Sequence, residues 1–167
     1  HHEWPADLDT LCGITIGRLV STRTMEGLCC VTRGVNVTDL RINYRPDLRQ
    51  PILFAGFAGW NDAGESATSA IRFMRRRWRS QVFADVHPEN FYDFTQARPR
   101  VRLEKGERVL EWPQNRFYAH KHEGAHQDII LLEGIEPHLA WHHYVDAVMG
   151  FCREYNVSGV VILGALL

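Results

Sequence analysis

Apolar runs alternate with amphipathic segments along the chain from residue 51 onward. Residues 51–57 form a short, continuous apolar run that ends in glycines, which is typical of a buried strand. The same pattern predicts further strands over residues 81–86, 116–122, 127–134 and 158–167. We therefore expect a sheet made largely of buried strands.

Two segments between these runs have the helical period. Residues 61–79 carry an apolar stripe, and Asp62 followed by Glu65 has the spacing of a capping box, so we expect a helix that begins at about Asn61 or Asp62. Residues 137–156 predict a second helix with Pro137 at or near its first position and Asn156 at its end. The expected stripes are Ala63, Ala67, Ala70, Ile71, Met74 and Trp78 in the first helix, and Leu139, Tyr144 or His143, Val145, Val148, Phe151 and Tyr155 in the second.

Residues 98–112 alternate apolar and charged side chains around Lys105-Gly106, which predicts an antiparallel hairpin. Taken in order, these elements predict an α/β fold: a mainly parallel sheet with flanking helices and an antiparallel hairpin insertion. We assign residues 46–167 to one α/β domain and leave residues 1–45, whose periodicity is weak, unassigned. Because the chain stops within an apolar run, we expect a fragment truncated at its C-terminus.

Composition narrows the class of protein. The chain has 167 residues, of which 45% are hydrophobic, so it can bury a core. Its net charge of -1 gives no electrostatic reason to expect a nucleic acid or an anionic membrane as partner. No run approaches the roughly 20 apolar residues of a membrane span. The four cysteines form no CxxC pair, which favours free thiols in the cytoplasm over a zinc site.

Polar residues follow the predicted buried strands. Trp60, Asn61 and Asp62 come after the first strand, and Glu133 and Glu136 come at the end of a later one. Since ligands of open α/β sheets bind at the carboxyl ends of the strands, we expect these five residues to share one rim. Asn61 and Asp62 are equally well explained as helix caps. We add one residue from elsewhere, Arg98, as a candidate partner of the rim carboxylates.

The motifs that normally carry catalysis are missing from this rim. The stretch "GFAGWNDAG" lacks the lysine of a phosphate-binding loop, and the chain has no nucleophile elbow. The histidines include no H-E-x-x-H pair, so we expect no metal and no cofactor. Arginines along the first helix, at positions 72, 75, 76 and 79, predict a solvated face or a contact with an acidic partner.

Five motifs appear in order: "PILFAGFAGWNDAGESATSAIRFM", "FYDFTQARPRV", "EWP", "DIILLEGIEPHLAW" and "VVILGALL". Together they resemble the proteasome assembly chaperone 2 family, especially its actinobacterial members, over residues 47–167. The resemblance implies a phosphorylase-like α/β fold and a binding role without catalysis. It also implies that a proteasome-docking tail lies beyond "LGALL", at the far C-terminus of such proteins.

We therefore expect a non-enzymatic, cytoplasmic, homo-oligomeric module that binds a protein, with proteasome subunits as the candidate partners. The alternative is a small-molecule-binding or hydrolase/phosphorylase-like protein. Its site would be the rim of Trp60, Asn61, Asp62, Arg98, Glu133 and Glu136.

Overall fold

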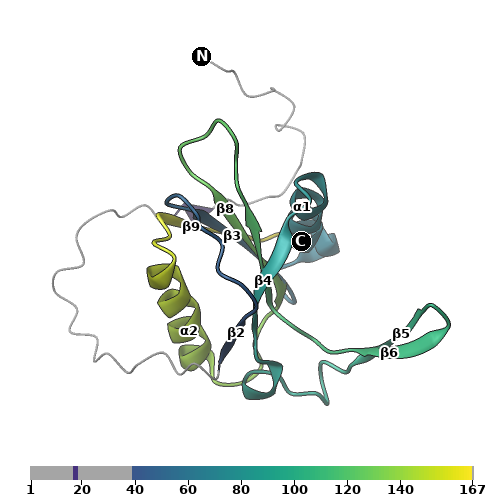
Figure 1. The fold of residues 1–167 in the computed structure, drawn as a ribbon. Helices are drawn as coiled ribbons and strands as arrows, with labels where there is room; N and C mark the ends of the chain where they lie inside the picture. The colour runs from purple at the N-terminus through teal and green to yellow at the C-terminus, as the bar shows by residue number, and fades with distance from the viewer. Residues whose placement is uncertain (1–16, 19–38, 167) are drawn as a thin grey trace.

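The structure, a computed structural model, describes residues 17–18 and 39–166. One seven-stranded sheet carries a helix on each face, and a two-stranded hairpin projects away from it (Figure 1). The strands of the sheet are β1 (Gly17–Arg18), β2 (Leu40–Ile42), β3 (Ile52–Ala58), β4 (Gln81–Val86), β7 (Arg116–His120), β8 (Ile129–Ile135) and β9 (Gly159–Leu163). The helices are α1 (Ser66–Arg77) and α2 (Trp141–Glu154), and the hairpin is β5 (Arg100–Glu104) with β6 (Glu107–Glu111).

The order of strands in the sheet is β1-β9-β3-β8-β7-β4-β2. β3 pairs in parallel with both β8 and β9, while the other neighbours pair antiparallel. The predicted α/β class is thus confirmed, but the sheet is mixed where a mainly parallel one was predicted, since two of its six strand pairings are parallel. The short connection of residues 121–128 explains the antiparallel pairing of β7 with β8, because strands joined so closely must run in opposite directions.

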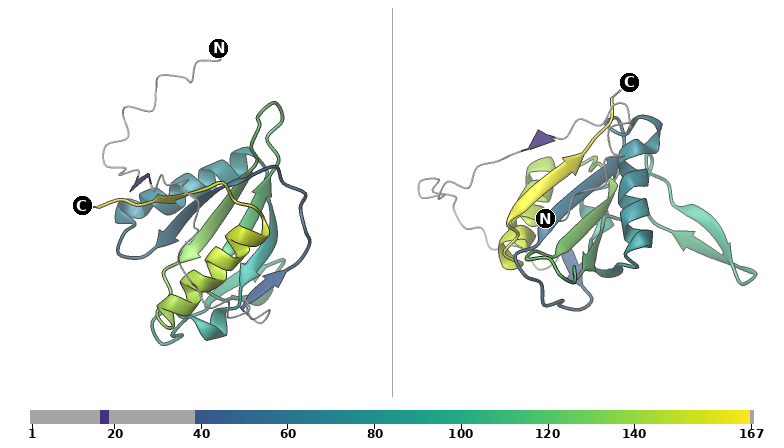
Figure 2. Two further views of the ribbon diagram at one scale, coloured as in Figure 1. Left: turned by 90° about the vertical axis from the view of Figure 1, so that its left-hand side faces the viewer. Right: turned by 90° about the horizontal axis from the view of Figure 1, so that it is seen from above.

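A helix lies against each face of the sheet (Figure 2), and a core of buried side chains lies between each helix and the sheet. Successive side chains of a strand point to opposite faces, so Leu131 of β8 packs under α1 whereas its neighbour Leu132 packs under α2. The larger core lies on the α2 face and includes Leu53, Ala55, Phe83, Phe117, Leu132 and Phe151. The smaller core surrounds Ile71 of α1.

Both helices begin later than the sequence pattern predicts. α1 begins at Ser66, because a 3-10 turn with Gly64 at φ 61° and Glu65 at φ 55° comes first. α2 begins at Trp141, since Ala140 has φ 50°; the prediction that Pro137 is its first residue is wrong. The predicted end at Asn156 is confirmed, because this residue takes the left-handed conformation that closes a helix.

The buried stripe of α2 is rotated from the expected one. Tyr144 and Phe151 are buried as predicted, but Ala147 and Cys152 join them. Val145 and Leu139 are about half exposed instead. The helix therefore covers the centre of the sheet and leaves one apolar flank toward β9.

The predicted hairpin is confirmed, with Lys105 and Gly106 both at positive φ in its turn. The domain boundary at residue 46 stays a prediction, because most of residues 1–45 lie outside the described part of the chain. Within residues 17–18 and 39–166, every helix is too short or too polar to cross a membrane.

Candidate functional site

Asp62 lies buried in the turn between β3 and α1 and binds the start of the helix. Its Oδ1 accepts the backbone N–H groups of Ala67 (2.7 Å) and Thr68 (3.2 Å), and its Oδ2 accepts the Thr68 hydroxyl (2.6 Å). The expected role of Asp62 as a cap is confirmed, although the helix starts four residues later. The capping box is wrong, since the Glu65 side chain pairs with Arg72 at 3.0 Å.

The turn after β3 also contacts the turn after β9. The Ala165 N–H donates to the Asn61 carbonyl (3.0 Å), and the Ala63 N–H donates to the Ala165 carbonyl (3.1 Å). Gly164 lies between them with no room for a Cβ atom beside the Asn61 side chain. The rim thus brings "GWNDAG" and "LGALL" together, as the strand order leads one to expect.

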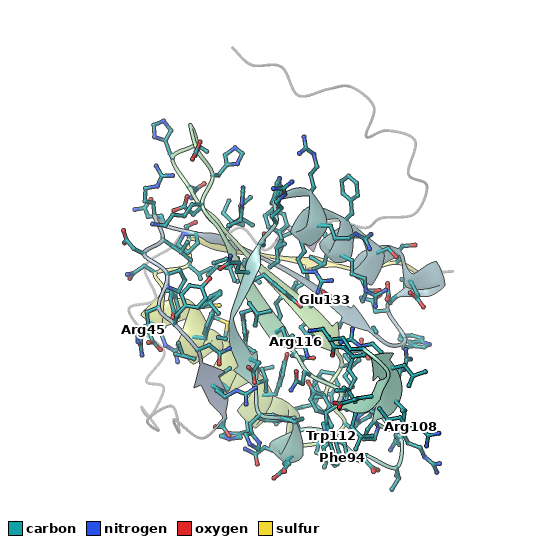
Figure 3. All side chains as sticks on the ribbon, turned by 45° about the vertical axis from the view of Figure 1, so that its right-hand side comes forward. Arg45, Phe94, Arg108, Trp112, Arg116 and Glu133 are labelled. Atoms are coloured by element: carbon teal, nitrogen blue, oxygen red, sulfur yellow. The ribbon has the colours of Figure 1, made fainter. Side chains whose placement is uncertain are left out.

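Glu133 points to the α1 face, on the same side of β8 as Leu131. It pairs with Arg72 (Nε to Oε1, 2.9 Å) and Arg75 (NH1 to Oε2, 3.0 Å) of α1. Arg116 stands opposite it on β7, and Figure 3 shows these two residues close together. Arg72 and Arg75 were predicted to be solvated or bound to a partner, but both form ion pairs with Glu133 of their own chain.

Glu136 lies on the other side of the rim, away from the arginines of α1. A Cβ atom on Gly59 would come within 2.9 Å of its Oε2, so the two residues touch. Its backbone N–H donates to the Ala58 carbonyl at 3.2 Å. The two-residue periodicity of β8 explains why Glu133 and Glu136, three apart, do not form a pair of acids.

An apolar groove of about 290 Å³ lies between α2, β3 and β9. Glu136 and Asn61 are at its polar end, and Glu133 does not line it. The remaining lining residues are aliphatic or aromatic: Leu53, Ala55, Phe57, Leu132, Pro137, Trp141, Tyr144, Val145, Val148, Met149, Val160, Ile162 and Leu163. Such a groove suits an apolar surface or ligand better than a charged substrate.

The last two candidates lie in solvent. Trp60 is 89% exposed. Arg98 is exposed as well, and no ion pair joins it to a rim carboxylate within the described residues. The structure therefore separates the six candidates into a buried cap, an ion-paired glutamate, two residues lining a groove and two solvent-exposed side chains.

Asn115 joins the end of β8 to α2 through its side chain, a role that the sequence pattern does not predict. It is fully buried, accepts the Ile135 N–H through Oδ1 (2.7 Å) and donates from Nδ2 to the Ile135 carbonyl (3.1 Å) and to Tyr144. Gly134 has no room for a Cβ atom next to it. A lone amide after "WPQ" carries no motif that would have revealed this role.

Two other kinds of reactive group were considered in the sequence, a cysteine nucleophile and a metal-binding cluster. Burial raises the pKa of the Cys152 thiol to about 11, so it is protonated and inert at neutral pH. No group of three or more His, Cys, Asp or Glu residues suited to a metal ion occurs in the described part of the chain.

Comparisons with known proteins agree on one family. The PAC2 family model matches residues 56–167. A solved PAC2 family protein from Streptomyces avermitilis is 40% identical, with a TM-score of 0.67 over 70% of this chain and 50% of that one. A proteasome-assembly chaperone homologue from Mycobacterium tuberculosis is 31% identical, with a TM-score of 0.62 over 66% of this chain and 48% of that one.

A more distant neighbour shares the fold alone. This is Pyrococcus furiosus PbaB, an archaeal proteasome activator, at 21% identity and a TM-score of 0.57 over 72% of this chain and 48% of that one. No curated protein matches the sequence. The chain spans about half the length of the solved relatives.

Proposed function

This chain belongs to the PAC2 family, and from that premise we propose that it is a non-enzymatic protein-binding module with proteasome subunits as partners. One relative at 31% identity is a proteasome-assembly chaperone homologue, which supports this choice of partner. The proposal includes self-association and a cytoplasmic location.

The observation that carries the proposal is how the rim uses its side chains. The carboxylates of Asp62 and Glu133, which acid–base catalysis would need free, are bound within the chain. Trp60, by contrast, is 89% exposed on a turn fixed from both sides by hydrogen bonds. Exposed tryptophans on rigid supports are typical of the residues that dominate binding energy at protein interfaces.

The test is binding of the purified protein to proteasome α and β subunits of the same organism, measured by titration calorimetry. We expect Trp60→Ala to weaken binding by about thirtyfold or more, the scale of an interface hot spot. Its free energy of unfolding should stay within about 0.5 kcal/mol of the original, as for surface substitutions. The matched control is Phe73→Ala, which removes another exposed aromatic side chain from the outer face of α1.

Phe73→Ala should bind as the unchanged protein does. The proposal fails if the unchanged protein does not bind either type of subunit. It also fails in its choice of site if Trp60→Ala binds with unchanged affinity.

The apolar groove favours a second candidate, a small-molecule-binding protein. Its volume of about 290 Å³ is near the lower end of ligand pockets, and Asn61 and Glu136 could orient a polar group at its end. The hydrolase-like or phosphorylase-like character stays a prediction. Mass spectrometry of the natively purified protein should detect a bound apolar molecule of fixed mass, and its consistent absence would count against this candidate.

A further inference from the structure

The β5–β6 hairpin, called the arm below (residues 100–112), has one bare apolar face. Directly opposite residues share a face of the ladder, so Val101 and Leu110 lie on one side together with Leu103 and Trp112, and Arg108, opposite Leu103, is the one charged residue on that side. Their exposed fractions are 62%, 57%, 72% and 44%. The other side carries five charged residues, Arg100, Arg102, Glu104, Glu107 and Glu111, around a single apolar one, Val109.

The arm projects from the body, and only its base is anchored there (Figures 1 and 2). Trp112 packs edge-on against Phe94 at the base, with ring centroids 5.0 Å apart, while Arg108 lies farther out on the arm (Figure 3). Every residue of β5 and β6 is exposed. A two-stranded hairpin of this kind is marginally stable alone in water, so a partner strand would stabilise it.

We propose that the arm is a self-association element in which β5 pairs antiparallel with β5 of a second copy, around a two-fold axis at Arg102. In this register Arg100 stands opposite Glu104 of the second copy, and Val101 stands opposite Leu103, each pair occurring twice. These are the ionic and apolar cross-strand pairs that stabilise antiparallel ladders. The one like-charge pair is Arg102 with its own copy, and each Arg102 has Glu104 of its own chain at 3.3 Å.

The hydrogen-bonding pattern agrees with this register. In a hairpin with a two-residue turn, the pair beside the turn exchanges hydrogen bonds and the pattern then alternates. Val101 and Leu103 consequently direct their backbone N–H and C=O groups to the free edge of β5. The proposed register sets these two residues opposite each other, so both exchange hydrogen bonds with the second copy.

The other edge of the arm is a poorer match. Pairing β6 with β6 of a second copy around Val109 would place Glu107 opposite Glu111 twice, and like charges directly opposite are destabilising. The charge pattern therefore favours pairing through β5 over this pairing through β6. This inference deepens the self-association in the proposed function, and its test contains no proteasome, so the two can fail separately.

Reversing the charges of the proposed Arg100–Glu104 pair tests the register. The measurement is the dimer affinity by sedimentation velocity at low salt. Glu104→Arg sets two arginines opposite each other across the two-fold axis, and we expect the dimer to weaken by about tenfold or more. Within its own arm the same change replaces the Glu104–Glu107 pair by an arginine opposite Glu107. This opposite-charge pair should stabilise the hairpin, so a weaker dimer would not be explained by loss of arm structure. Arg100→Glu should weaken the dimer as well, and mixing the two single variants should restore it as a heterodimer.

Two single cysteine variants, compared with each other, locate the two-fold axis. Arg102→Cys should form an intermolecular disulfide under mild oxidation, because adjacent strands lie about 4.8 Å apart. Val109→Cys occupies the directly opposite position on β6 and should not cross-link to its own copy. The unchanged protein controls for its four native cysteines.

A monomeric unchanged protein, undiminished association of Glu104→Arg, or failure of the mixed variants to associate would each overturn the proposal. So would cross-linking through Val109→Cys but not Arg102→Cys, which would indicate pairing through β6.

Discussion

The rim turn (residues 59–65) and the arm both combine charged side chains with a turn at positive φ, yet they use their polar groups in opposite ways. In the rim turn, the Asp62 carboxylate accepts three hydrogen bonds from α1, and backbone groups bind the turn after β9. In the arm, all side chains of both strands are exposed and the free strand edges have no partner within the described residues.

This difference shows where to look for function. Residue types favoured the rim as a site of chemistry and the arm as a plain hairpin. A polar group that is already bound within its own chain is costly to detach, whereas an exposed apolar face has binding energy left to gain. The groups that remain without an internal partner are therefore better guides to binding than the presence of acids in a turn.

The largest effect on stability is expected where the rim is most buried. Asp62→Ala removes the acceptor of two backbone N–H groups and leaves the buried Thr68 hydroxyl with a weak contact to the Glu65 carbonyl. We expect the free energy of unfolding to fall by about 3 kcal/mol, the sum of a strong helix cap and an orphaned buried group. Urea denaturation followed by circular dichroism measures this change.

Asp62→Asn is the control, because its side-chain oxygen can still accept hydrogen bonds, and it should lose much less. If Asp62→Ala unfolds at the same urea concentration as the unchanged protein, the rim turn is not held by its cap and the contrast with the arm disappears.

Lowering the pH should also lower the free energy of unfolding, because it protonates a buried carboxylate of the α/β body. Asp128, fully buried immediately before β8, pairs with the Arg49 side chain at 2.9 Å, and this hydrogen bond is the main reason its pKa is lowered to about 2. A lowered folded-state pKa stabilises the protein above the unfolded value of about 4 and ceases to do so as the pH falls through about 2. Because Arg49 is half exposed, we expect a loss of about 1 kcal/mol between pH 6 and pH 3.

The measurement is the urea midpoint as a function of pH. Asp128→Asn should flatten this acid dependence while lowering stability at neutral pH. Glu104→Gln removes one carboxylate of an exposed ion pair in the arm and should leave the dependence intact. Equal slopes for Asp128→Asn and the unchanged protein would contradict the role given to this carboxylate.

The sequence predicted what local pattern determines. Strand positions follow from apolar runs, and the hairpin follows from alternation around Lys105-Gly106. The helix starts were placed too early because Glu65 and Ala140 adopt left-handed φ, which the intrinsic preferences of these residue types do not predict. A mainly parallel sheet was expected, but four of the six strand pairings are antiparallel, because the direction of a pairing depends on which strands become neighbours.

The sequence predicted where the candidate site lies in the sheet, but not how its side chains are paired. Asn61 and Asp62 do meet Ala165 at the carboxyl ends of the strands. Which face Glu133 would occupy required the register of β8, and its pairing with Arg72 and Arg75 required the position of α1. Asn115 could not be anticipated, because its three hydrogen bonds are all made to residues at least 20 positions away.

The smallest effect on stability is expected in the arm. Leu103→Ser removes an apolar side chain that is 72% exposed, so the free energy of unfolding should change by no more than about 0.5 kcal/mol. The same change removes two Val101–Leu103 contacts of the proposed dimer, each worth about 0.2–1 kcal/mol, and should weaken self-association by roughly two- to thirtyfold. Sedimentation and urea denaturation of one sample separate the two quantities. A variant that lost stability without losing association would show that the arm, like the rim, uses its side chains within its own chain.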